Sequence, residues 1–183
     1  EPGAIVWKDR MLVYFAAIGA RPGGNPPQAQ SIGLAITTDG VTFAPPARVL
    51  EQAPVYPPAR NFVGYSTPMP FELGGKVHLV YDVAINRPGG DPEWQQVALH
   101  HAVSADGETG WVQDDKPLLT RDDFPWTGGE IRSPSILVEN GTIRMWFAGH
   151  GSRPQLGQMI GRGFKGGEFG IGYAVRPATD LMP

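Results

Sequence analysis

A six-residue sequence occurs twice in this chain, as Arg-Pro-Gly-Gly-Asn-Pro at residues 21–26 and as Arg-Pro-Gly-Gly-Asp-Pro at residues 87–92. The two copies are 66 residues apart, and a third Arg-Pro pair follows after another 66 residues. Three series of residues keep this spacing: Arg21, Arg87 and Arg153; Pro2, Pro68 and Pro134; and Phe15, Tyr81 and Phe147. A fixed period of this length predicts a fold built from repeated supersecondary units.

Each unit has the pattern of short strands joined by tight turns. Strands are predicted at residues 4–7, 11–17, 31–37 and from 41–43 in the first unit; at 76–83, 97–103 and around Trp111 in the second; and at 135–138, 143–148 and 170–175 in the third. Short β-branched and aromatic runs separated by Asx-Gly turns are typical of hairpins. No segment has a long apolar period of 3.6 residues, so almost no helix is expected.

Four antiparallel strands repeated around an axis define a propeller blade. The sequence therefore predicts one all-β, propeller-like domain over residues 1–183, with repeats at 1–66, 67–132 and 133–183, the last incomplete. A ring needs at least four blades, and open strand edges are avoided in proteins. We therefore expect further blades from the same longer chain or from other copies in a homo-oligomer.

Composition excludes several classes of protein. The net charge is −3 without a basic cluster, which argues against a nucleic-acid partner. No apolar run reaches the length of a membrane span, so no membrane partner is expected. The absence of cysteine excludes disulfides and a thiol nucleophile. His78, His100, His101 and His150 are scattered, so no metal site and no cofactor are predicted, although a structural calcium ion stays open.

The predicted topology gathers candidate site residues on one face. Glu1, Thr67 and Ser133, each just before a repeat proline, share this face with the three Arg-Pro loops. Residues 51–66 and 120–132 are predicted as long loops there, and long loops commonly carry function. They supply aromatic rings and charged groups suited to a sugar: Tyr65, Trp126, Glu130 and Arg132. Asp82 ends a strand on the same face.

These residues also have structural interpretations. The aromatic side chains could fill gaps between blades instead of binding a sugar. Arg21, Arg87 and Arg153 could tie the carbonyl groups of their own loops together, or they could form a cluster for an anionic group on a ligand.

Several motifs resemble the five-bladed propellers of glycoside hydrolase families 43, 32 and 68. They are Ser133-Pro134-Ser135-Ile136 with Met145-Trp146-Phe147-Ala148-Gly149, then Ile32-Gly33-Leu34-Ala35 with Asp39-Gly40, and Ile171-Gly172-Tyr173-Ala174. The resemblance implies acidic residues at the start of the first strand in successive blades. The matching positions hold Glu1, Thr67 and Ser133, so only the first is acidic. The resemblance also favours a secreted or periplasmic location.

Two functions follow from this pattern. The first is hydrolysis of an oligosaccharide or polysaccharide, in which Glu1 and Glu130 form the carboxylate pair and Asp82 is a further catalytic candidate. Carboxyl groups roughly 5–10 Å apart would suit this chemistry. The alternative is a non-catalytic module that binds a glycan or a protein through its arginine-lined face.

Overall fold

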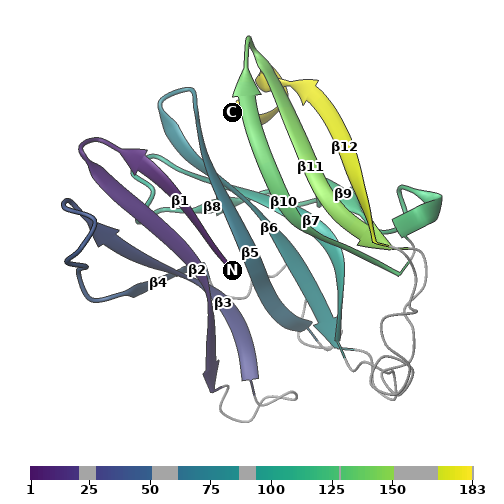
Figure 1. Cartoon of the computed structure of the whole chain (residues 1–183), viewed down its shortest axis with the longest axis horizontal. Helices are drawn as coiled ribbons and strands as arrows, with labels where there is room; N and C mark the ends of the chain where they lie inside the picture. Colours follow the sequence, from purple (N-terminus) through teal and green to yellow (C-terminus); the bar gives the residue numbers. More distant parts are fainter. Residues whose placement is uncertain (21–27, 51–61, 87–93, 128, 151–168, 183) are drawn as a thin grey trace.

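The computed structural model describes residues 1–20, 28–50, 62–86, 94–127, 129–150 and 169–182, and these residues form β-strands with two short 3₁₀ turns (Figure 1). Three groups of strands follow one another along the chain. The first group is β1 (Pro2–Trp7), β2 (Arg10–Ala20), β3 (Gln28–Thr37) and β4 (Ala47–Leu50). The second is β5 (Phe62–Leu73), β6 (Lys76–Asn86), β7 (Trp94–Ser104), β8 (Val112–Gln113) and β9 (Leu119–Thr120). After η2 (Pro125–Thr127), the third is β10 (Glu130–Glu139), β11 (Thr142–His150) and β12 (Gly170–Pro177), followed by η3 (Ala178–Leu181).

Pairing within each group is antiparallel, as expected for strands joined by tight turns. The first two groups meet through a single parallel pair, Gln30 with Gly64. A side chain at Gly64 would collide with the backbone of Gln30, so this close approach requires glycine. The third group is a separate sheet. The all-β, propeller-like prediction is thus confirmed, whereas the repeat boundaries stay a prediction.

The first strands of the three groups lie side by side. β1 and β10 both contact β5, and the three groups spread outward from this region in Figure 1. The amino end of β1 therefore lies beside strands that are more than 60 residues distant in sequence, which places residues from all three groups at one site.

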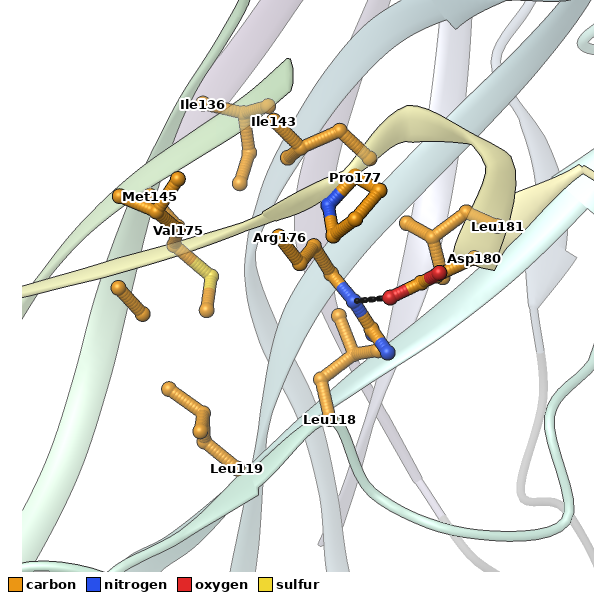
Figure 2. A pocket seen from close by; sticks show the side chains of 11 residues that line it. Leu118, Leu119, Ile136, Ile143, Met145, Val175, Arg176, Pro177, Asp180 and Leu181 are labelled. Atoms are coloured by element: carbon orange, nitrogen blue, oxygen red, sulfur yellow. Dashed lines mark ion pairs between the residues drawn. The ribbon is translucent and has the colours of Figure 1, made fainter. Parts of the chain in front are cut away.

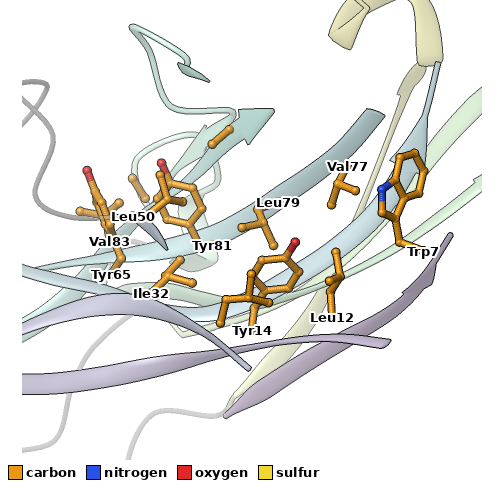
Figure 3. Packing of buried hydrophobic residues seen from close by; sticks show 13 residues of the cluster. Trp7, Leu12, Tyr14, Ile32, Leu50, Tyr65, Val77, Leu79, Tyr81 and Val83 are labelled. Atoms are coloured by element: carbon orange, nitrogen blue, oxygen red, sulfur yellow. The ribbon is translucent and has the colours of Figure 1, made fainter. Parts of the chain in front are cut away.

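Apolar faces hold the groups together. One buried cluster lies between the first and second groups and includes Leu12, Tyr14, Ile32 and Leu79 (Figure 3). The other joins the second group to the third and includes Phe147. Each fully buried side chain of this size contributes about 1.5–3 kcal/mol, so the face-to-face packing of sheets is the main source of stability.

The fourth strand of the first group was predicted wrongly at residues 41–43. The Asp39 carboxylate accepts hydrogen bonds from the backbone N–H groups of Val41 and Thr42, at 2.9 and 2.7 Å. These hydrogen bonds hold the chain in a turn and lower the pKa of Asp39 well below its usual range. After a single backbone hydrogen bond from Ala44 to Ile36, regular strand pairing with β3 begins at β4. Asp106 caps an equivalent turn in the second group, and Trp111 lies just before β8.

The long loops predicted before Pro68 and Pro134 are partly strand. β5 and β10 begin at Phe62 and Glu130 and continue through these prolines. One extra residue is accommodated in each strand by a bulge, between Ser66 and Met69 in β5 and between Arg132 and Ser135 in β10. Proline cannot donate to a neighbouring strand, and a bulge is where sheets tolerate it.

Candidate functional site

The carboxylate of Glu130 is fully buried at the start of β10. Its Oε1 accepts a hydrogen bond from Nη1 of Arg132 at 3.2 Å, and its Oε2 lies 3.2 Å from Nε2 of His150 on β11. The two strands pair Glu130 directly with His150. A buried carboxylate is stable only with such partners, so the hairpin itself creates a polar site.

Arg132 connects this buried carboxylate to the surface. Its Nη2 lies 3.4 Å from Oε1 of Glu1, whose side chain is 60% exposed, and its Nε donates to Ser133 Oγ at 3.3 Å. One planar guanidinium thus bridges Glu1 and Glu130. The bridged oxygens therefore lie no more than about 9 Å apart, because the terminal nitrogens of a guanidinium are separated by only about 2 Å.

Asp82 completes the cluster from β6. Its Oδ1 accepts from the Ser66 hydroxyl, and its Oδ2 accepts from Thr67 Oγ1 at 2.5 Å and from the backbone N–H of Ser133 at 3.4 Å. Burial raises the pKa of Asp82, while these donors and the Arg132 charge act in the opposite direction. The structure therefore brings together Glu1, Asp82, Glu130 and Arg132, four residues that sequence analysis selected.

The two predicted sugar-binding aromatics lie in different environments. Trp126 on η2 is 36% exposed and stacks on Phe147 with ring centroids 5.8 Å apart. Gly149 and Gly170 lie beneath its ring, where an added Cβ would approach to 3.1 Å. Tyr65 is only 1% exposed and donates to Gln113 Oε1 at 3.0 Å. The ring of Tyr65 packs in the core (Figure 3), and a sugar-binding role for it stays a prediction.

The predicted arginine cluster lies outside the described residues, because Arg21, Arg87 and Arg153 fall in the segments 21–27, 87–93 and 151–168. Within the described part of the chain, no group of three His, Asp or Glu side chains has a geometry that could hold a metal ion. Also within that part, no helix is long and apolar enough to cross a bilayer.

His150 is the site residue that sequence analysis missed. The residues next to His150 in the sequence do not indicate a role for it. The register of the β10–β11 hairpin does, because it places His150 opposite Glu130. Counting outward from the turn at Asn140 and Gly141 pairs Glu139 with Thr142 and brings Glu130 to within one residue of His150. The bulge after Arg132 supplies that last residue.

Two other histidines form a separate buried chain. Nδ1 of His78 lies 2.9 Å from Nε2 of His101, whose Nδ1 lies 3.0 Å from Oδ2 of Asp114. Nε2 of His78 lies 3.1 Å from the carbonyl oxygen of Leu73. This chain connects strands β6 and β7 to the loop after β8 and contains no residue of the carboxylate cluster.

A pocket of about 360 Å³ lies elsewhere, between the loop before β9 and the sheet formed by the third group of strands (Figure 2). Its walls are mainly apolar side chains, among them Leu118, Ile143 and Met145, and Arg176 pairs with Asp180 at 3.5 Å along one side. The pocket has no carboxylate pair that could carry out acid–base chemistry. The cluster around Arg132 is therefore the better candidate site.

No family model matches the sequence, and no curated protein matches it either. Solved structures do match. A GH32 β-fructofuranosidase of Bombyx mori has 19% identity and a TM-score of 0.61 over 97% of this chain and 33% of its own. An N-acetylgalactosamine deacetylase from F. plautii, solved with blood group B trisaccharide, has 19% identity and a TM-score of 0.62 over 96% and 49%. Zg3597, a family 117 glycoside hydrolase of Zobellia galactanivorans, has 15% identity and a TM-score of 0.66 over 96% and 51%.

These structures define the class of fold. The chain has the fold of the β-propeller glycoside hydrolases and related enzymes, as its motifs indicated. At these identities the likeness concerns the fold alone. The chain spans from one third to about half of the length of the three solved chains.

Proposed function

We propose that this chain acts on a glycan, as a glycoside hydrolase in which Glu1 and Glu130 are the carboxylate pair. The observation that carries the proposal is the bridge by Arg132, which holds the two carboxylates within about 9 Å. Hydrolysis of a glycosidic bond needs one carboxyl group to protonate the leaving oxygen and another to attack the sugar or activate water, at separations of about 5–9.5 Å.

Substrate access depends on Arg132. Glu1 faces solvent, whereas Glu130 is fully buried and contacts the guanidinium, whose side chain is 27% exposed. A substrate therefore reaches Glu130 only when the groups that cover it move, and the Arg132 side chain is the partly exposed one among its contacts. Trp126 is the predicted stacking surface for a sugar ring, because its indole is partly exposed and rests on Phe147. The fold neighbours, which are glycoside hydrolases and a sugar deacetylase, support a glycan as the partner.

The test is release of reducing ends from a panel of oligosaccharides, including fructosides and N-acetylhexosamine-containing chains. Glu1→Gln and Glu130→Gln should each lower turnover by about 10²–10⁴-fold, the usual contribution of a general acid or base. Glu139→Gln is the control, because Glu139 is exposed at the other end of the same strand and pairs only loosely with Arg144, at 3.9 Å. Full turnover by either site variant contradicts the proposal.

A binding module is the second candidate, and the complete burial of Glu130 favours it. In that case the wild-type chain retains a glycan on an affinity column but releases no reducing ends. Glu1→Gln and Glu130→Gln then leave retention unchanged.

A further inference from the structure

Asp82 is linked to the other site residues through Ser133 and does not face solvent. It lies on β6, it is fully buried, and its three hydrogen-bond donors come from two different strands. Ser66 and Thr67 belong to β5, and Ser133 belongs to β10. One carboxylate thus joins the second group of strands to the third. Since its oxygens already accept three hydrogen bonds and are closed to a substrate, direct participation in catalysis is not the role that this geometry favours.

The donors on Oδ2 belong to residues with unfavourable backbone conformations. Thr67 has φ 47° and Ser133 has φ 53°, both in the left-handed region that non-glycine residues rarely adopt. Both precede proline at the bulges of β5 and β10. Such conformations persist only where surrounding interactions impose them, and they occur mainly at functional sites. The Asp82 carboxylate is an interaction that both residues share.

A continuous set of contacts leads from Asp82 to the catalytic pair. Asp82 accepts from the N–H of Ser133, Ser133 Oγ accepts from Nε of Arg132, and the Arg132 guanidinium contacts Glu130 and Glu1. Arg132 also acts electrostatically on Asp82, because its charge opposes the rise in the pKa of that carboxyl. The conformation of Ser133 thus links Asp82 to the guanidinium.

We infer that Asp82 is a positioning residue, which fixes the bulge at Ser133 so that Arg132 stands between Glu130 and Glu1. The effect of this positioning on a reaction rests on the proposed function, whereas the positioning itself is a property of the free protein. It gives Asp82 a role distinct from the catalytic one expected from the sequence.

The experiment is nitrogen-15 NMR of the arginine Nε–H groups in the full 183-residue chain, with the Arg132 signal assigned from Arg132→Lys. Asp82→Asn keeps the size of the side chain but replaces one acceptor oxygen with an amide NH₂ group. This group cannot accept the hydrogen bonds that Ser66, Thr67 and Ser133 donate to Asp82. The Arg132 signal should shift, and its hydrogen should exchange with water about tenfold faster, because the hydrogen bond to Ser133 is loosened.

Asp106→Asn is the matched control. Asp106 also accepts backbone hydrogen bonds, from Glu108 and Thr109, but in a turn that includes no site residue. It should leave the Arg132 signal unchanged even if it lowers stability. If Asp82→Asn does not fold, Thr67→Val removes a single donor to Asp82 and should produce a smaller shift of the same signal.

An Arg132 signal that is unaffected by both Asp82→Asn and Thr67→Val overturns the inference, whether or not the chain cleaves glycans. A shifted signal in a chain without hydrolytic activity keeps the positioning role and refutes only the proposed reaction. In an active chain, Asp82→Asn should lower kcat about tenfold or more with little change in KM, because the catalytic geometry is altered.

Discussion

At the scale of single residues, the surroundings of His78 disfavour a second proton on its ring. Its Nε2 lies 3.1 Å from the carbonyl oxygen of Leu73, which can only accept, and its Nδ1 lies 2.9 Å from Nε2 of His101. A protonated His78 would be buried beside a second imidazole, away from water.

The first prediction at this scale concerns stability in acid. Burial lowers the pKa of His78 and of His100 to about 4, from 6.5 in a free chain. Between these values the unfolded chain binds protons that the folded chain does not, so stability falls as the pH drops from about 6.5 to 4. The loss reaches up to about 3 kcal/mol per group at the acid end.

Urea unfolding at several pH values in this window measures the effect. In His78→Gln the free energy of unfolding should depend less steeply on pH than in the wild type, because one of the two groups is removed. Equal slopes for the two proteins would show that His78 does not take up a proton on unfolding.

Residue types in the sequence were enough to select Glu1, Asp82, Glu130 and Arg132, which the fold brings together. Carboxylates and arginines are chemically conspicuous in a sequence, so they were easy to select, and their roles in a reaction stay a prediction. His150 was missed because its role depends on register. The core position of Tyr65 was not predicted, because a tyrosine beside a loop has the same sequence signature as one in a core. Burial separates these cases, and it is a property of tertiary structure.

At the scale of elements, the bulges of β5 and β10 explain where strand prediction failed. Long loops were predicted over residues 51–66 and 120–132, just before the two prolines, yet strand pairing continues on both sides of Pro68 and Pro134. The hydroxyl-bearing residue before each proline takes the left-handed conformation that allows this. Local propensity alone does not indicate such a conformation, since surrounding contacts impose it.

The second prediction tests this strain at Ser133. Ser133→Gly should be more stable than Ser133→Ala by about 1 kcal/mol, because glycine adopts a positive φ without strain and both variants lack the hydroxyl. Ser135, two residues further along β10, is the control. Ser135 is not among the residues with positive φ, so the Ser135→Ala protein should be at least as stable as the Ser135→Gly protein. Chemical denaturation of the four variants gives both differences, and Ala more stable than Gly at Ser133 would contradict the strain.

At the scale of the whole molecule, the three-stranded sheet of the third group exposes an apolar face. Large side chains on β10, β11 and β12 point to solvent together, and the rings of Trp146 and Tyr173 lie 5.3 Å apart on it: Leu137, Trp146, Ile171, Tyr173 and Val175. Patches of this kind are typical of surfaces that another element covers. This agrees with the sequence-based expectation of further blades around the axis, which stays a prediction.

The third prediction follows from that face. These 183 residues alone should associate in sedimentation velocity experiments at micromolar concentration, because the patch is buried by contact with a second copy. The double variant Trp146→Lys, Tyr173→Lys should shift the distribution toward monomer, whereas Arg144→Lys on the same face should not. A wild-type chain that is monomeric throughout would remove the argument for missing blades.

The bridge from Glu1 to Arg132 also has a consequence for the order of events during folding. The two residues are 131 positions apart in sequence, and contacts of such long range form late, after the intervening chain has lost most of its freedom. During synthesis, which proceeds from the amino end, Glu1 leaves the ribosome long before its partner exists. The contact between Glu1 and Arg132 therefore forms only when all three groups of strands are in place, and an incompletely folded chain lacks the assembled cluster.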